Sequence, residues 1–418
     1  MKKTVLYDWH VQNGANMAPF GQYEMPLWYT GGVKAEHLAV IQSGGVFDTS
    51  HMAVVTVSGK GSRDLLQYCF SKDMDRCVGL KKAPLHDGRC VYGVFLNEDG
   101  TVLDDAIVYQ LSADQFMVVV NAGMGADIAE RLNAHNKQGA EVRDLTDNAG
   151  KMDIQGPVAG KVMATLLENS GEVFQGMAYF SFKGGFDDIG SSAVKLKDGT
   201  PVLLSRTGYT GEFGFEIFMA RDQLANVWQQ VLDAGASFGV LPCGLAARDS
   251  LRAGAVLPLS HQDVGNWLFK NNPWQFALAW DDEQKSFTKS FFGADAVLKA
   301  GDDEFTLAFA GFDPRKIVVS EGTFVTNLDG EQIGTILTCA TDMAIGRVDG
   351  EVISIASADK PEDFVPKGVS CGFVKVRENL APGTEVILTD GKRKKIKVEI
   401  RGDVRPGRTA RRPMKEMV

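Results

Sequence analysis

Alternating apolar and polar residues are clearest between Tyr92 and Asn121, which read YGVFLNEDGTVLDDAIVYQLSADQFMVVVN. The pattern predicts three consecutive strands, because successive side chains of a strand point to opposite faces. Asp99-Gly100 between two apolar runs is typical of a two-residue hairpin turn, and residues 112–115 form a looser second turn. These residues are therefore expected to form an antiparallel meander.

The first turn sets the register of the hairpin. With Asp99-Gly100 as the loop, the expected pairs are Leu96 with Leu103, Val94 with Asp105 and Tyr92 with Ile107. Asp105 then shares an apolar side of the middle strand and lies beside a tyrosine. A carboxylate on an apolar sheet face costs free energy unless it is paired or used. This makes Asp105 the best single functional candidate.

A structural alternative remains open for Asp105. A register slip of one residue would turn Asp105 to solvent and Asp104 inward. In either register the two adjacent carboxylates are expected to point apart along the strand. We therefore do not expect Asp104 and Asp105 to form a catalytic dyad.

Other periodic segments surround the meander. Helical spacing of apolar residues is seen at 34–43, at 126–136 and in the helix that Asp222 is expected to cap. The three glycines of SRTGYTGEFGFEIFM, residues 205–219, permit a close-packed loop before a strand. From Glu304 onward, short strands alternate with Gly, Asp and Pro turns, which is typical of a β-barrel or sandwich.

Composition indicates an ordinary soluble protein of two or three domains. The chain has 418 residues, 44% hydrophobic and 23% charged. No apolar run approaches the roughly 18 residues of a membrane span, and the first residues are too polar for a signal peptide. The six cysteines are scattered without a CxxC pair, so we expect reduced thiols and a cytoplasmic location.

Common metal and nucleotide motifs are absent. The histidines lack a spacing such as HExxH, so no metal site is expected. The chain has no GxxxxGK[ST] loop, no GxGxxG after a strand and no GxSxG nucleophile elbow. Its chemistry must therefore depend on a different constellation.

Charge is distributed unevenly. The net charge is −9, yet residues 392–418 carry eleven Lys/Arg against three Asp/Glu, which leaves −17 on the remainder. An acidic body argues against nucleic-acid binding. The basic end could dock an anionic ligand or an acidic partner; a lysine-protected edge strand with a solvated tail is the favoured interpretation.

Several collinear motifs resemble one family. GANMAPFGQYEMPLWY, EHLAVIQSGGVFDTSHM, YGVFLNEDGTVLDDAIVY, QGPVAG, RTGYTGEFGFEIF and CGLAARDSLRAGAVLPLSHQD are similar to the glycine cleavage system T-protein (aminomethyltransferase) family. The resemblance covers about residues 5–345, with a weaker trace to about 400. It implies an α+β fold of three domains in a cloverleaf around a central folate hole. Two of the implied domains are discontinuous in sequence: the first comprises 1–58 plus 148–256, and the second, folate-contacting domain comprises 59–147 plus 257–298. The third, 304–418, is a C-terminal β-barrel-like domain with a basic tail.

The resemblance also implies a site. It gives Asp105 the catalytic role, orienting the folate N10 and accepting or relaying a proton. The tetrahydrofolate contacts that it implies are Met52, Tyr92, Val119, Asn121, Tyr209, Glu216, Arg248 and Trp280. No metal is implied.

Each residue type suits its implied role. A carboxylate such as Glu216 can accept two pterin N–H donors, unless it is a solvent-facing strand residue. Arg248 suits an anionic p-aminobenzoyl-glutamate end, unless it pairs with Asp249 or Glu216. Tyr92 and Tyr209 could stack or donate to the ligand, or belong to the core.

The implied reaction takes a one-carbon unit from an aminomethyl-lipoyl carrier protein and gives methylene-tetrahydrofolate and ammonia. An alternative is a tetrahydrofolate-dependent methyltransferase or demethylase for a small N-, O- or S-methylated donor. That alternative arises because the chain departs from the family pattern at Tyr23, in residues 333–343 and in an apparent insertion at 349–367. Trp267, Phe269 and Trp274 could form a cation–π box for such a donor, although core packing is favoured.

The expected partners follow from these two reactions. They are a lipoylated carrier protein of the H-protein type or a small methylated donor, with no nucleic acid and no membrane. A monomer or weak oligomer is expected.

Overall fold

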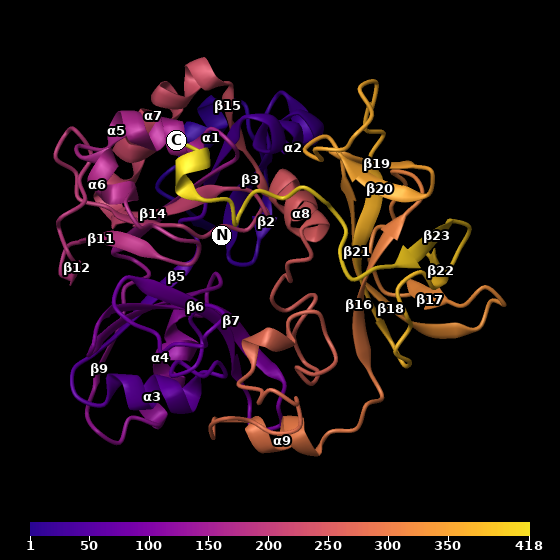
Figure 1. Cartoon of the computed structure of the whole chain (residues 1–418), viewed down its shortest axis with the longest axis horizontal. Coiled ribbons are helices and arrows are strands. Elements are labelled where there is room, and N and C mark those ends of the chain that lie inside the picture. The colour runs from indigo at the N-terminus through magenta and orange to yellow at the C-terminus, as the bar shows by residue number, and fades with distance from the viewer.

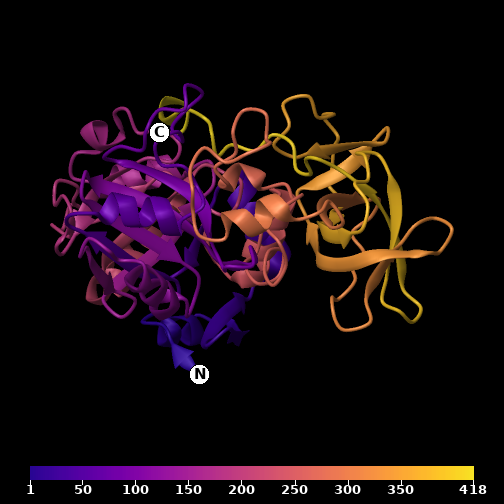
Figure 2. The same cartoon turned by 90° about the horizontal axis from the view of Figure 1, so that it is seen from below.

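Three units surround the middle of the molecule in the computed structural model, which describes all of residues 1–418 (Figure 1). A seven-stranded sheet with helices and a five-stranded sheet with two helices lie on one side, and a barrel lies on the other. The view from below separates the barrel from the two sheet-containing units (Figure 2). The expected mixed α and β architecture with a C-terminal barrel is confirmed. No helix combines the length and apolar character that crossing a membrane requires.

The seven-stranded sheet builds the first unit. Its core holds Trp228, Val227 and Val231, which lie on one face of α7 and pack against the sheet. The strand order is β12-β11-β13-β14-β10-β4-β15. In chain order the strands are β4 (Gly44–Asp48), β10 (Ala149–Gln155), β11 (Phe182–Phe186), β12 (Ile189–Gly190), β13 (Leu203–Ser205), β14 (Gly214–Ala220) and β15 (Val240–Cys243).

Helices and a small sheet complete this unit. The three-stranded sheet has the order β1-β3-β2, formed by β1 (Lys2–Lys3), β2 (Asn16–Phe20) and β3 (Tyr23–Trp28). The helices are α1 (Tyr7–Gln12), α2 (Gly32–Gln42), α5 (Ala159–Leu166), α6 (Ser170–Phe174), α7 (Leu224–Gly235) and α8 (Leu245–Gly254), with 3₁₀ turns η1 (Arg221–Gln223) and η2 (Ala236–Phe238). Asp222 lies within η1 and does not cap α7, because the chain tightens into a 3₁₀ turn before the helix begins.

The five-stranded sheet contains the predicted meander. Its order is β6-β7-β8-β5-β9, and it packs on α3 (Ser62–Cys69) and α4 (Gly125–Ala134). The strands are β5 (Ala53–Ser58), β6 (Arg89–Leu96), β7 (Val102–Ser112), β8 (Gln115–Val120) and β9 (Glu141–Asp144). Since β5 pairs with β8 and β9, residues 53–58 belong to this sheet, and the expected first-domain segment ending at 58 extends one strand too far.

The register of the first hairpin is confirmed in part. Val94 pairs with Asp105 and Tyr92 with Ile107, as predicted. Leu96 pairs with Val102 instead of Leu103, because a β-bulge lies between Phe95 and Leu96. The slip that would have turned Asp105 outward therefore does not occur.

The third unit is a closed six-stranded barrel. Its strand order is β16-β21-β18-β17-β22-β23, and the interior is filled by aliphatic side chains and Phe309. The strands are β16 (Phe305–Gly311), β17 (Phe324–Thr326), β18 (Gln332–Asp342), β21 (Val369–Val376), β22 (Glu385–Thr389) and β23 (Lys395–Ile400), with a separate hairpin of β19 (Ile345–Val348) and β20 (Glu351–Ser354).

A connecting segment, residues 255–303, runs between α8 and the barrel through the middle of the molecule (Figure 1). It contains η3 (Gln275–Ala277) and α9 (Ala294–Lys299). Gly265 O accepts a hydrogen bond from Val102 N, so the segment is attached to the start of β7. Its apolar residues share one core with that strand and with the barrel.

The C-terminal strap, residues 401–418 with η4 (Met414–Glu416), leaves the barrel and crosses back over α8 to the first unit (Figure 1). Met414 and Met417 enter the core of the first unit. Arg405 is fully buried between Glu212 and Asp342. The expected solvated tail is therefore wrong, because these buried ion pairs and methionines hold the strap against the protein.

Candidate functional site

Asp105, near the start of β7, is held by Tyr92 of β6 and by Asn121, which directly follows β8. Tyr92 Oη donates a hydrogen bond to Asp105 Oδ2 at 2.8 Å, and Asn121 Nδ2 donates to Oδ1 at 2.6 Å. Ile107 and Tyr109, on the same side of β7, pack against the seven-stranded sheet. Asp105 remains partly exposed, whereas its neighbour Asp104 is fully buried.

Asp104 belongs to the same cluster, although we expected it to point away from Asp105. Asn121 Nδ2 also donates to Asp104 Oδ1 at 2.7 Å, and the Asn121 backbone N–H donates to Oδ2 at 2.9 Å. Ser260 Oγ adds a third hydrogen bond at 2.8 Å. The pairing of β7 with β8 stops at Ala106 and Val120. Asn121 can therefore reach around the strand end and bridge both acids.

Burial makes the two acids hold protons more strongly than usual. Burial and the charge of Asp105 raise the pKa of Asp104 to about 7. Burial also raises the pKa of Asp105, while the hydrogen bonds from Tyr92 and Asn121 oppose that shift. Because the two groups interact, they titrate as a pair. The pair is therefore suited to holding one proton near neutral pH.

A second polar cluster lies inside the first unit. Lys151 Nζ contacts Asp153 Oδ1 at 2.8 Å and Glu216 Oε1 at 2.7 Å, and Arg248 Nη1 contacts Asp153 Oδ2 at 2.7 Å. Thr207 Oγ1 donates to Glu216 Oε2 at 2.5 Å. All five side chains are buried, so the solvent-facing alternative for Glu216 is wrong, and Arg248 pairs with Asp153 rather than with Asp249 or Glu216.

Tyr209 packs against the ion-pair cluster. The Arg248 guanidinium lies 4.9 Å from the centre of its ring, and its hydroxyl donates to the Pro258 carbonyl. Burial raises the pKa of Tyr209, and the nearby charge of Asp105 acts in the same direction. The tyrosine thus contacts the ion-pair cluster and lies within electrostatic range of Asp105.

The remaining predicted residues are apolar or aromatic. Val119 and Met52 pack in the apolar layer between the two sheets. Trp280 packs against Phe287 with ring centres 4.3 Å apart, and it borders the same core as Tyr92. Its buried indole Nε1 has no hydrogen-bond partner. The structure therefore joins Tyr92, Asp105 and Asn121 by hydrogen bonds, whereas Val119 and Met52 belong to the layer between the sheets and Trp280 borders the core beside Tyr92.

The comparisons with known proteins agree with this arrangement. The family model described as "GCVT N-terminal domain" matches residues 6–280. The aminomethyltransferase of Symbiobacterium thermophilum is 33% identical over 342 residues, covering 81% of this chain and 85% of that protein. The aminomethyltransferase of Staphylococcus carnosus is 31% identical over 367 residues, covering 87% and 92%. The chain belongs to the GCVT family of aminomethyltransferases.

A solved relative extends the likeness to the whole fold. The glycine cleavage system aminomethyltransferase T from Bartonella henselae superposes with a TM-score of 0.74 at 26% identity, covering 99% of each chain. The resemblance predicted from the motifs is thus confirmed, including the class of enzyme. As a GCVT-family protein, the chain is a transferase.

The methylated-donor alternative is not favoured. Phe269 and Trp274 are each only 1% exposed, and Trp274 packs edge-on to Phe373 of the barrel. Lys375 Nζ lies 4.6 Å from the ring centre of Trp267. Phe269 and Trp274 are therefore core residues, and the ring of Trp267 already faces a lysine. The three aromatic side chains do not form an open cation–π box.

Sequence reasoning missed five residues of the two clusters: Asp104, Lys151, Asp153, Thr207 and Ser260. Lys151 and Asp153 are separated by two positions in a strand and share one face, a signal that the sequence carried. Ser260 reaches Asp104 from a segment 156 residues away, so no local pattern could reveal it. No group of three or more His, Cys, Asp or Glu side chains is arranged to hold a metal ion.

Proposed function

We propose that this transferase uses tetrahydrofolate as the acceptor of a one-carbon unit delivered as an aminomethyl group. The observation that carries the proposal is the Asp105 carboxyl group, partly exposed and held by Tyr92 and Asn121, in a chain of this family. The reaction would release ammonia and methylene-tetrahydrofolate.

The residues present suit a reduced pterin. An exposed aromatic face lies next to the tyrosine that binds the acid: Phe276 is 59% exposed and lies 6.0 Å from Tyr92, measured between ring centres. Trp280 offers a buried, unpartnered indole N–H. A carboxylate accepts N–H donors well, and aromatic faces stack on a heterocycle. Tyr92, Asp105, Asn121, Tyr209 and Trp280 are the residues we assign to this ring.

Glu216 is assigned a structural role, and Arg248 keeps its predicted role toward the anionic end of the substrate. The Glu216 oxygens are already bonded to Lys151 and Thr207, so its remaining capacity for a pterin donor is small. Arg248 uses one nitrogen on Asp153 and keeps other donors for an anionic end of the substrate. Met52 and Val119 are assigned to the apolar wall.

The chain's own groups account for the proton movement. Asp105 takes the proton that leaves a reacting N–H group, since it is the partly exposed member of the acid pair. Asn121 and Tyr92 fix the direction of its two oxygens. Burial raises the proton affinity of Asp105, and the charge of Asp105 in turn raises that of the fully buried Asp104.

The proposed donor is a lipoylated carrier protein of the H-protein type. Its support is the family, because the Bartonella relative is described as an aminomethyltransferase of the glycine cleavage system. The six cysteines are free thiols, which agrees with the expected reduced state. A cytoplasmic location and a monomer or weak oligomer stay predictions.

The test compares Asp105→Asn with the wild type in an assay of methylene-tetrahydrofolate formation from aminomethylated carrier, with methylated small molecules run in parallel. We expect the wild type to form methylene-tetrahydrofolate from the aminomethylated carrier and not from the methylated small molecules. The variant should bind tetrahydrofolate normally and lose about 10²- to 10⁴-fold in kcat, because the amide cannot accept the proton.

Asp114→Asn serves as the matched control, since Asp114 lies exposed in the second turn of the same meander. It should retain full activity. Near-normal turnover by Asp105→Asn would refute the assignment of Asp105, and activity of the wild type with a methylated donor alone would refute the proposed reaction.

A further inference from the structure

His261 is the basic side chain beside the acid pair. Its Nε2 lies 3.7 Å from Asp104 Oδ1, and its side chain is 50% exposed. Neither Asp104 nor Asp105 forms an ion pair with a lysine or arginine, so the His261 imidazole is the basic group within ion-pair distance of the two acids. The charge of His261 also lowers the pKa of Asp105, against the effect of burial.

The backbone aims this side chain at the acids. His261 has φ +62°, in the left-handed region that few non-glycine residues adopt. Its neighbour Ser260 donates to the same Asp104 oxygen that faces the imidazole. This strained backbone conformation therefore occurs at a residue whose side chain lies between the acid pair and solvent.

The acids themselves are poorly placed to exchange protons with bulk water. Asp104 is fully buried, and Asp105 lies where the substrate is expected to cover it. One Asn121 amide group joins them, since each N–H of Nδ2 is donated to a different carboxylate. The half-exposed His261 imidazole beside Asp104 provides a route for protons to solvent. The 3.7 Å between His261 Nε2 and Asp104 Oδ1 can be bridged by one water molecule or closed by a small rotation of the side chain.

We propose that His261 exchanges protons between the Asp104–Asp105 pair and solvent. The inference rests on the proposed function, in which Asp105 receives a proton in each turnover. His261 acts through Asp104 and does not touch the substrate, so it is a positioning residue rather than a catalytic one.

The step is a proton transfer alone. The O–H bond of the acid pair breaks as the second N–H bond of the imidazole forms, and the imidazolium then gives that proton to water or buffer. Asp104 and Asp105 on β7 are the charged groups that face the imidazole, and Tyr92 lies beyond them. Asp263, two residues along, is paired with the buried Arg252 and does not compete.

The first test needs no substrate. The Asp104 carboxyl group is followed by ¹³C NMR of aspartate-labelled protein across a pH titration, in the wild type and in His261→Asn. Asparagine tolerates the left-handed conformation, so the loop should be preserved. We expect the Asp104 titration to move upward by about half a pH unit or more, because a nearby positive charge has been removed.

His261→Gly is the second variant, since glycine adopts positive φ without strain and leaves room for added imidazole. The control is His86→Asn, which alters an exposed histidine of the connection before β6. In the turnover assay His261→Gly should lose about ten- to a hundred-fold in kcat with an unchanged folate KM, and free imidazole should restore part of it. The control should show neither effect.

The outcomes separate the two proposals. An unchanged Asp104 titration in both His261 variants, or a lost kcat that imidazole does not restore, overturns the role of His261. An inactive wild type overturns the proposed function instead, and the titration then decides alone whether His261 is coupled to the acid pair.

Discussion

The two adjacent aspartates Asp104 and Asp105 influence each other's protonation. Asp105 alone was the predicted residue, yet Asp104 is the more deeply buried acid and has the pKa raised to about 7. Asn121 binds both through one amide group. The periodicity of β7 correctly indicated which side of the strand carries Asp105. It could not show the bridge, because Asn121 follows a different strand.

The raised pKa of Asp104 predicts a pH effect on stability. An unfolded aspartate titrates near pH 4, whereas the folded Asp104 holds its proton to about pH 7. Its contribution to stability is therefore fully present below about pH 4 and is lost as the pH rises through 7. Asp104→Asn keeps a neutral side chain at every pH, so its Tm relative to the wild type should increase between pH 5 and pH 8.

Differential scanning fluorimetry at several pH values measures this difference. For the control Asp114→Asn, in an exposed turn, the difference in Tm from the wild type should be the same at every pH. A constant offset for Asp104→Asn as well would contradict the raised pKa.

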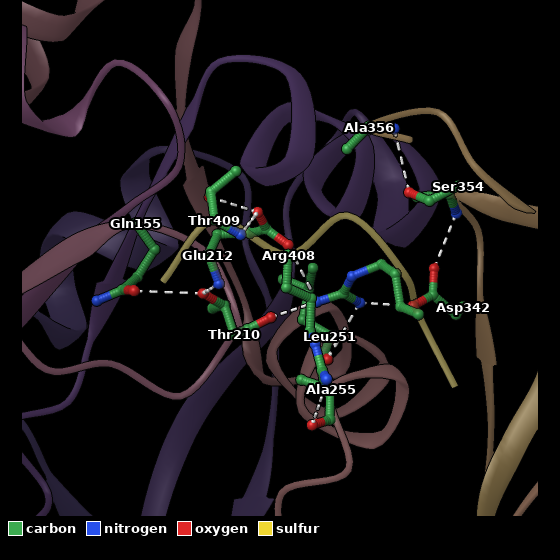
Figure 3. Close-up of polar contacts among 12 residues, drawn as sticks. Gln155, Thr210, Glu212, Leu251, Ala255, Asp342, Ser354, Ala356, Arg408 and Thr409 are labelled. Carbon is green, nitrogen blue, oxygen red and sulfur yellow. Dashed lines mark hydrogen bonds and ion pairs between the residues drawn. The ribbon is translucent and has the colours of Figure 1, made fainter. Parts of the chain in front are cut away.

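At the scale of elements, the glycine loop before β14 depends on the strap. Thr409 Oγ1 donates to Glu212 Oε2 at 2.7 Å and accepts from Phe213 N at 2.9 Å, and Ala410 N donates to Gly211 O. Figure 3 shows Thr409 beside Glu212, with Thr210 next to them. The loop that carries Tyr209 is thus fixed by residues about 200 positions later in the chain.

Thr409→Val should loosen this loop. The substitution keeps the shape of the side chain and removes both hydrogen bonds of the hydroxyl, leaving buried groups unsatisfied at a cost of about 1–3 kcal/mol. We expect faster hydrogen exchange at the Phe213 amide and a higher KM for the folate. Thr384→Val, at a half-buried barrel position outside the strap, is the control and should change neither. Unchanged exchange at Phe213 would show that the strap does not hold the loop.

At the scale of the whole molecule, buried charges join the units. Arg405 Nη1 contacts Asp342 of the barrel at 2.5 Å, and Nη2 contacts Glu212 of the first unit at 3.3 Å. On the far side of Asp342, His37 Nε2 lies 2.9 Å from Oδ1, and Ser250 Oγ lies 2.7 Å from His37 Nδ1. The barrel is therefore fastened to α2, α8 and the strap by one polar chain, part of which appears in Figure 3.

Arg405→Met should uncouple the barrel from the first unit. Two buried carboxylates lose their cation, and breaking a buried pair in this way costs about 3–5 kcal/mol. We expect a lower Tm and a split of the calorimetric transition into two. Arg411→Met, an exposed position in the same strap, is the control and should unfold like the wild type. A single transition at the wild-type Tm would mean that the apolar contacts of the strap suffice.

The local elements and the family follow from the amino-acid sequence alone. The alternation from Tyr92 to Asn121 produced the meander, the helical spacing at 34–43 and 126–136 corresponds to α2 and α4, and the turn-separated strands after Glu304 close into the barrel. These features depend on residues close to one another in the chain, so periodicity and turn chemistry could reveal them.

The contacts between distant charged residues depend on the packing of the whole chain. The bulge beside Leu96, the bridging of Asp104 and Asp105, the Lys151 cluster and the docking of the basic strap all depend on contacts between segments far apart in sequence. A buried charge is stable only beside its partner, and the partner's position is fixed by the packing of whole units. For that reason the sequence indicated Asp105 but not the groups that set its protonation.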